Sequence, residues 1–251
     1  MKLTVLGSCG AWPEPGRACS GFLLEHEGFQ LVVDLGFGVA SRLFEHCPAE
    51  ALDAVVITHE HPDHCVDLNA VLRARYYAEA PRIPLFCTPG VVQRLSAVEP
   101  RPPLAASFDI VDLPGSHEVG PFRLTGVLLP HHVPNAGVRL TTKDATVAYT
   151  GDTGPDPALA ELGRAADLFI VEATLTTPQD GPRTLMTARE AGRWGARAGA
   201  KRLMLSHFWP GSDRAQAVRD AATEFPGAVI CAEEGASVAF PAAHQGRETH
   251  P

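Results

Sequence analysis

The chain has 251 residues, 45% of them hydrophobic and 20% charged, with a formal net charge of −8. This composition suits a chain with a large buried core and excludes general disorder. The acidic balance disfavours an extended nucleic-acid surface, and no apolar run reaches the length of about 18 residues that a membrane span needs. We therefore expect a cytoplasmic protein. The densest basic stretch, Arg73, Arg75 and Arg82, is interpreted as a solvated helix face.

Short apolar segments between Gly and Pro clusters predict the secondary structure in chain order. Strands are expected at 2–7, 20–25 and 29–34, and an apolar strand at 53–58 leads directly to His59. Residues 63–79 have the length and periodicity of one helix. A capping box from Thr187 to Glu190 predicts a helix start, and Gly199 predicts its end. Further strands are predicted at 83–87, 107–112, 121–130, 137–142, 145–150, 167–172, 201–206, 227–231 and 236–240.

These elements predict one domain over residues 1–241, made of two αβ halves, followed by a flexible tail over 242–251. The Pro-rich segment 99–103 and the segment 114–121 are the candidate junctions between the halves. Six cysteines are scattered without CxxC spacing, so we expect them to be reduced and mostly packed. They are Cys9, Cys19, Cys47, Cys65, Cys87 and Cys231.

The run after the strand 53–58 carries the strongest chemical signal. It places His59, His61, Asp63 and His64 within six residues, and imidazole and carboxylate groups are the usual ligands of catalytic zinc. The alternative reading is a merely polar loop, which does not account for so many metal-binding side chains directly after a buried strand. Isolated histidines are interpreted as surface or hydrogen-bonded residues; these are His26, His46 and His117, with His244 and His250 in the tail.

The HxHxDH pattern of this run resembles the metallo-β-lactamase superfamily, in its ribonuclease Z and phosphodiesterase-like branch. The resemblance spans nearly the whole chain and implies a four-layer αββα sandwich. Asp34 in LVVDLG is similar to an early aspartate of the family that supports the motif loop without binding metal. A helix-capping aspartate is the alternative interpretation of Asp34.

Three later residues match the remaining motifs of the family. The segment LLPHHVPNAGVRL resembles an HxxPxxGxR pattern, whose register selects His131 as the ligand and leaves His132 as a pocket residue, although adjacent histidines allow the reverse. Asp152 and His207 each follow a predicted strand. By resemblance, His59, His61 and His131 hold one metal, Asp63, His64 and His207 hold the other, and Asp152 bridges them.

The resemblance implies two divalent ions, with zinc favoured and manganese or iron admitted by the same ligands. Two ions about 3.5 to 4 Å apart activate a water as hydroxide and stabilise charge on the substrate. Asp63 is expected both to bind metal and to orient the hydroxide. Glu60, between two ligands, is given no catalytic role.

One position departs from the ribonuclease Z pattern. A histidine thought to protonate the leaving group stands there three residues before the helix-opening alanine, whereas this chain has Leu185. Leucine cannot transfer protons, so tRNA 3′-end processing is disfavoured and His132 becomes the candidate acid.

The leading hypothesis is a phosphodiesterase for a small, anionic phosphodiester or a nucleotide, cyclic nucleotides included. Hydrolysis of a lactone, thioester or other acyl compound is the alternative enzyme activity. A metal-stabilised binding or regulatory module with little turnover is the alternative from another class. A homodimer is expected from the resemblance alone.

Overall fold

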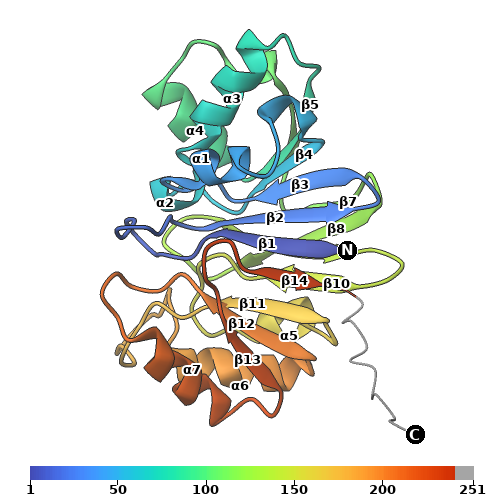
Figure 1. Ribbon diagram of the computed structural model, residues 1–251. Coiled ribbons are helices and arrows are strands. Elements are labelled where there is room, and N and C mark those ends of the chain that lie inside the picture. The colour runs from blue at the N-terminus through green and yellow to red at the C-terminus, as the bar shows by residue number, and fades with distance from the viewer. Residues whose placement is uncertain (241–251) are drawn as a thin grey trace, which may run out of the picture.

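The computed structural model describes residues 1–240, and two mixed sheets lie face to face at its centre (Figure 1). The first sheet has the strand order β14-β1-β2-β3-β4-β5-β6, and its strands are parallel from β3 to β6. Its strands are β14 (Ser237–Ala239), β1 (Lys2–Gly7), β2 (Gly21–His26), β3 (Phe29–Val33), β4 (Ala54–Ile57), β5 (Ile83–Cys87) and β6 (Phe108–Asp112).

The second sheet has the order β13-β12-β11-β10-β9-β8-β7 and is parallel from β10 to β13. Its strands are β13 (Ala228–Cys231), β12 (Arg202–Ser206), β11 (Leu168–Glu172), β10 (Thr146–Tyr149), β9 (Asn135–Thr141), β8 (Phe122–Leu129) and β7 (Gly115–Val119). In both sheets the parallel strands point their carboxyl ends toward the same edge of the sandwich, on the left in Figure 1.

Helices cover the outer faces of both sheets (Figure 1). Those on the first sheet are α1 (Val39–Phe44), α2 (Pro62–Cys65), α3 (Leu68–Tyr77) and α4 (Pro89–Val98), with short 3-10 turns at Ala49–Ala51 and Leu104–Ala106. Those on the second sheet are α5 (Ala158–Leu162), α6 (Ala188–Ala198) and α7 (Arg214–Ala222). This arrangement is the αββα four-layer sandwich that we expected.

Alternate residues of the central strands pack into different layers. In β4, Val56 belongs to the core between the two sheets, whereas Val55 and Ile57 belong to the core under the first set of helices. In β11, Ile170 faces the central core and Phe169 faces the core under the second set. Because both faces are buried, these strands read as continuous apolar runs, which is why the sequence predicted them well.

The structure corrects the prediction of a single helix over 63–79, because α2 and α3 are separate helices. At the break, the backbone N–H of Asp67 donates to Leu35 at 2.9 Å, and its carboxylate accepts the N–H of Ala40, at the start of α1, at 2.9 Å. Asp67 therefore ties the chain to the neighbouring loop and reorients it. Periodicity alone cannot reveal such a tertiary contact.

Arg75 is also corrected, because it is buried, not solvated. Its guanidinium donates to the carbonyl oxygens of Ala49, Leu52 and Pro81. These hydrogen bonds join α3 to the 3-10 turn at Ala49–Ala51 and to the loop before β5. Arg73 is exposed on α3 as predicted, whereas Arg82 is exposed but lies in the loop between α3 and β5, not on a helix.

The chain crosses between the sheets after β6, at Leu113 and Pro114. The candidate junction 114–121 starts at this crossing, but most of it forms β7, a strand that the sequence analysis missed. β7 lies at the sheet edge and alternates exposed polar residues with half-buried ones, which leaves a weak apolar signal. The segment 99–103 lies within the first half, between α4 and β6.

Several local predictions are confirmed. Thr187 and Glu190 form the capping box that starts α6, and Gly199 ends the helix in a left-handed conformation. All six cysteines are free, and five are buried. None of the helices in residues 1–240 is long and apolar enough to cross a membrane. The tail 242–251, with His244 and His250, lies outside the described residues.

Candidate metal centre

Strand ends bring the predicted ligands to one edge of the sandwich. The HxHxDH run follows β4, His131 follows β8, Asp152 follows β10 and His207 follows β12. These strands belong to different sheets, so the site lies where the two halves meet. The structure brings all seven predicted residues together in two groups that share Asp152.

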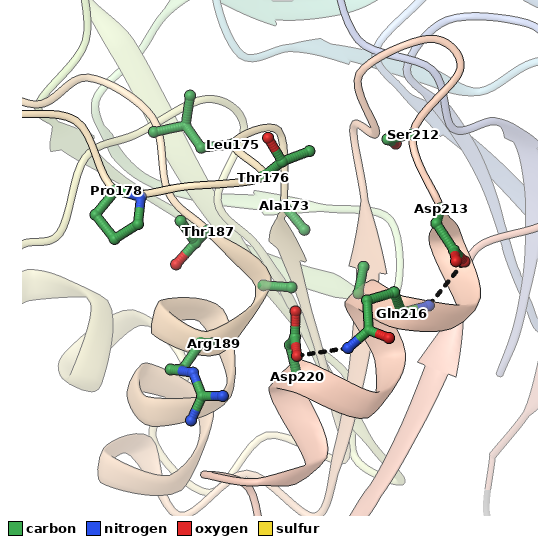
Figure 2. A pocket seen from close by; sticks show the side chains of 12 residues that line it. Ala173, Leu175, Thr176, Pro178, Thr187, Arg189, Ser212, Asp213, Gln216 and Asp220 are labelled. Carbon is green, nitrogen blue, oxygen red and sulfur yellow. Dashed lines mark hydrogen bonds between the residues drawn. The ribbon is translucent and has the colours of Figure 1, made fainter.

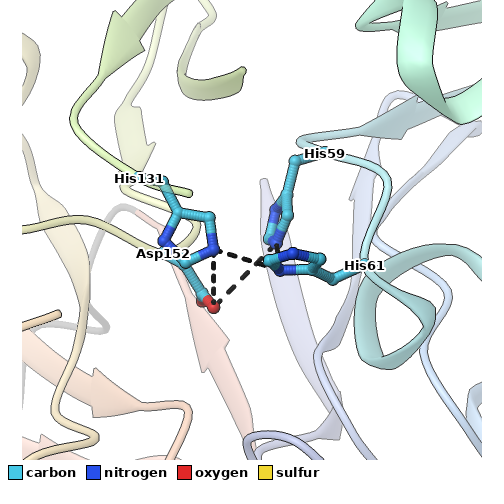
Figure 3. A group of neighbouring side chains, drawn as sticks. All are labelled: His59, His61, His131 and Asp152. Atoms are coloured by element: carbon cyan, nitrogen blue, oxygen red, sulfur yellow. Dashed lines mark hydrogen bonds and ion pairs between the residues drawn. The ribbon is translucent and has the colours of Figure 1, made fainter. Parts of the chain in front are cut away.

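The first group contains His59, His61, His131 and Asp152 (Figure 3). The Nδ1 atom of His61 lies 3.1 Å from Nε2 of His59 and 3.1 Å from Nε2 of His131. The Oδ2 atom of Asp152 lies 3.9 Å from Nε2 of His59 and 3.7 Å from Nε2 of His131. Three imidazole nitrogens and one carboxylate oxygen therefore converge.

The second group contains Asp63, His64, His207 and the other oxygen of Asp152. The Oδ1 atom of Asp152 lies 3.2 Å from Nε2 of His64 and 3.2 Å from Nε2 of His207. The Oδ2 atom of Asp63 lies 3.2 Å from Nε2 of His207 and 3.7 Å from Nε2 of His64. Asp152 thus presents one oxygen to each group.

These distances fit metal coordination. Four ligands at about 2.0 to 2.1 Å from a tetrahedral zinc ion lie about 3.3 to 3.4 Å from one another. In addition, Nε2 of His64 and Oδ1 of Asp152 are buried and have no hydrogen-bond partner among the residues that the structure describes. A buried polar atom without a partner costs free energy, and a cation at this position removes that cost for both atoms.

The outer nitrogens of two histidines donate to fixed acceptors. His131 donates from Nδ1 to the carbonyl oxygen of Thr184 at 3.0 Å. His64 donates from Nδ1 to Oδ2 of Asp34 at 2.7 Å. Each contact fixes the tautomer and leaves the Nε2 lone pair facing the centre.

Threonine hydroxyls hold the Nδ1 atoms of two other histidines in the same way, so that their Nε2 atoms also face the centre. The hydroxyl of Thr58 donates to Asp34 at 2.9 Å and therefore accepts from Nδ1 of His59 at 3.1 Å. The hydroxyl of Thr174 lies 2.7 Å from Nδ1 of His207 and also donates to Glu172 at 2.6 Å. The backbone N–H of Thr58 donates to Asp34 as well, at 2.8 Å, so Asp34 supports the motif loop as the resemblance implied.

The buried charges also fit cations. In the part of the chain that the structure describes, the ion-pair partners of the carboxylates of Asp34, Asp63 and Asp152 are all histidines. Burial opposes ionisation of Asp152, but His207 and His64 hold its pKa well below its ordinary value. Burial alone would lower the pKa of His64, yet Asp152 and Asp34 raise it well above its ordinary value. The carboxylates thus favour positive charge at the centre, which divalent ions would supply in place of protons.

His132 lies outside both groups. Its ring is exposed, with its centroid 5.2 Å from that of His131, and its Nε2 atom lies 2.9 Å from the hydroxyl of Thr184. It therefore contacts the residue directly before Leu185, whose side chain is half-buried. Glu60 faces Arg94 on α4 at 3.9 Å, away from the metal-facing atoms.

The sequence analysis missed Glu172, which binds the Thr174 hydroxyl that contacts His207. This fully buried carboxylate accepts from the N–H and hydroxyl of Thr174 and from the N–H of Met186 at 2.5 Å. Burial raises the pKa of Glu172 to about 8. A usable signal existed, because an acidic residue at the end of the apolar strand 167–172 needs partners when it is buried.

A separate cavity of about 210 Å³ lies between α6, α7 and the segment that follows β11 (Figure 2). It is lined in part by Ala173 and Leu175, but by none of the seven clustered residues. Figure 2 shows Gln216 hydrogen-bonded to Asp213 and Asp220 on its wall.

The sequence pattern of the Beta-lactamase superfamily domain matches residues 30–208, a range that contains all seven clustered residues. The chain belongs to this superfamily. Probable metallo-hydrolase YhfI of Bacillus subtilis is 31% identical over 252 residues, which cover 94% of this chain and 98% of the relative. The crystal structure of YhfI has a TM-score of 0.87 and 30% identity, and the match covers 95% of this chain and 99% of that one.

Two further matches extend the comparison to a curated relative and a solved structure. Ribonuclease Z of Kineococcus radiotolerans is 28% identical over 261 residues, covering 82% of this chain and 83% of the relative. The short form of human tRNase Z shares the fold, with a TM-score of 0.75, 23% identity and coverage of 96% and 100%. The resemblance inferred from the motifs is therefore confirmed, and the protein is a metallo-hydrolase of the β-lactamase superfamily.

Proposed function

We propose that the protein is a dinuclear phosphodiesterase that hydrolyses a small phosphodiester or a nucleotide, cyclic nucleotides included. The observation that carries this proposal is Asp152, whose two oxygens face two adjacent groups of nitrogen and oxygen donors. A site built around a shared carboxylate suits two neighbouring ions. When bound, such a pair supplies an activated water and neutralises charge on the non-bridging phosphate oxygens.

The ligand assignment follows the two groups. His59, His61 and His131 would hold one ion, Asp63, His64 and His207 the other, and Asp152 both. Zinc is the proposed metal because imidazole and carboxylate ligands suit it best. Elemental analysis of freshly purified protein tests this proposal, and manganese or iron in place of zinc would contradict it. A homodimer and a cytoplasmic location remain predictions.

Asp63 is proposed to orient the attacking water as well as to bind metal. Burial opposes its ionisation, but His64 and His207 lower the pKa of Asp63 far below its ordinary value. An ionised carboxylate is a hydrogen-bond acceptor, so it can hold the water by one O–H and aim the oxygen at phosphorus. The backbone N–H of Ala11 donates to its Oδ2 atom at 2.7 Å and fixes that orientation.

His132 is proposed to protonate the leaving oxygen. Its exposed imidazole stands beside His131 and contacts Thr184, so it occupies the neighbourhood in which the ribonuclease Z pattern has a histidine and this chain has Leu185. An imidazole ring can carry a proton on either nitrogen, so it can donate one to a departing alkoxide.

Ribonuclease Z activity is the second candidate, because a relative of that name covers most of the chain. Leu185 and the net charge of −8 count against it, since leucine cannot donate a proton and an acidic chain repels tRNA.

A substrate panel tests the proposal on the zinc- or manganese-loaded protein. We expect hydrolysis of bis(p-nitrophenyl) phosphate or 3′,5′-cyclic AMP, with little activity on p-nitrophenyl acetate, a lactone or precursor tRNA. Asp152→Ala is expected to abolish this activity, and Asp109→Ala, an exposed aspartate paired with Arg82, to retain it. Hydrolysis of the acyl substrates alone would refute the proposal, and so would inert protein that still binds a nucleotide.

A further inference from the structure

Two tryptophans lie side by side on the surface near the metal centre. Trp12 and Trp209 are 48% and 44% exposed, and their ring centroids are 4.9 Å apart with planes at 78°. An exposed apolar patch is informative because such patches often mark binding sites. Neither residue has a role in the ligand set or its support.

The backbone holds these two tryptophans in place from both sides. The N–H of Gly10 donates to Phe208 at 2.9 Å, and the N–H of Phe208 donates to Ser8 at 3.0 Å. The carboxylate of Glu14 accepts the N–H of Gly211 at 2.9 Å and pairs with Arg214 at 3.4 Å. The loops that carry the two rings are therefore fastened together and preorganised.

The same loops touch the metal centre. Ala11, directly before Trp12, donates its N–H to Asp63, and His207 stands two residues before Trp209. Because successive Cα atoms are about 3.8 Å apart, both tryptophans begin within about 8 Å of residues that contact the donor groups. A Cβ on Gly10 would lie 2.7 Å from the His207 ring, so glycine allows this close approach.

We propose that Trp12 and Trp209 form an aromatic wall in which one ring stacks on the base of the substrate and the other, nearly perpendicular to it, contacts the edge of that base, which makes the substrate a nucleotide phosphodiester. The inference rests on the proposed function, because it requires the phosphate to lie at the metal centre. Nucleobases stack on aromatic rings whatever their sequence, and each stack contributes about 1 to 3 kcal/mol. An aliphatic phosphodiester has no ring to contact the wall.

Substrate pairs with and without a base test the wall kinetically. Trp12→Ala and Trp209→Ala are each expected to raise the KM for 3′,5′-cyclic AMP roughly tenfold. The KM for the 3′,5′-cyclic phosphate of 1-O-methylribose, which lacks the base, stays the same, and the phenylalanine variants keep most of the affinity. Tyr77→Ala, which removes an exposed aromatic ring on α3, is the matched control and changes neither value. Equal changes for both substrates would overturn the proposal.

Binding without turnover separates this inference from the proposed function. The third tryptophan, Trp194, is buried, so fluorescence quenching reports mainly on Trp12 and Trp209. Adenosine 5′-monophosphate is expected to quench and to bind at least tenfold more tightly than ribose 5-phosphate, and the alanine variants lose this preference. If the preference is present while every phosphodiester is inert, the proposed function fails and the wall stands. If the two ligands bind equally, or if the alanine variants only dissociate a dimer, the wall is refuted.

Discussion

His64 donates its Nδ1–H to Oδ2 of Asp34 across 2.7 Å, and both side chains are completely buried. The contact fixes the histidine with its Nε2 atom toward the centre, where it faces the carboxylates of Asp152 and Asp63 and has no hydrogen-bond partner within residues 1–240. Asp34 also accepts two hydrogen bonds from Thr58, so one carboxylate positions both ends of the motif loop. Asp34 therefore holds both His64 and the motif loop in the orientation that places their donor atoms at the centre.

Asp34→Asn is expected to weaken metal binding by about 10- to 100-fold. An amide keeps the shape and tolerates the left-handed backbone (φ 58°), but its NH₂ must face one of three donors. Competition with a chelator measures the change. Asp167→Asn, which removes a carboxylate bound to Thr146 and Lys201 far from the site, is the control, and equal affinity in both variants would contradict the role of Asp34.

Glu172→Gln is expected to lower the free energy of unfolding by about 1 to 3 kcal/mol. At pH 9, above the raised pKa of Glu172, three donors surround an ionised carboxylate, so one of them meets the new NH₂ group. Urea denaturation measures the change. Glu25→Gln, at an exposed pair with Lys2, should change stability by less than about 0.5 kcal/mol, and similar values for the two variants would be inconsistent with a supporting role for Glu172.

His132→Ala is expected to lower kcat by an amount that depends on how readily the leaving group departs without a proton. An acidic p-nitrophenol departs without a proton, so its diester loses little, whereas a ribose alkoxide needs protonation and its ester loses about 10²- to 10⁴-fold. Steady-state rates on both substrates make the comparison. His117→Ala, a histidine on the edge strand β7, serves as the control. An equal loss on both substrates, or none on either, would remove His132 from the mechanism.

The double variant His132→Ala/Leu185→His is expected to have a kcat for the ribose ester at least tenfold higher than that of His132→Ala alone. The new imidazole would follow Thr184, whose carbonyl already binds His131, and would restore a proton donor at the position that the ribonuclease Z pattern uses. Leu185→Gln in the same background fills similar space without a transferable proton. Recovery by glutamine as well as by histidine would show that the gain is not proton transfer.

The sequence predicted every strand except β7, and the seven clustered residues, because each of these signals is local. A run such as 53–58 is apolar because both of its faces are buried, and the polar residues directly after it stand out. The supporting contacts were harder to predict, since Thr174 and Thr184 become important only where distant loops meet. The same reason explains the burial of Arg75, because its three carbonyl partners come from other turns.

The two tryptophans illustrate the same limit. Trp12 and Trp209 are 197 residues apart, and each precedes a proline, which is a modest signal of an ordered turn. Only the pairing of the two loops places the rings in contact.

Anomalous X-ray diffraction from zinc-loaded crystals tests the central claim most directly. We predict two peaks per chain about 3.5 to 4 Å apart, one on each side of the Asp152 carboxylate. One peak should lie among His59, His61 and His131, and the other among Asp63, His64 and His207. A single peak, or none at this edge of the sandwich, would contradict the two-metal account.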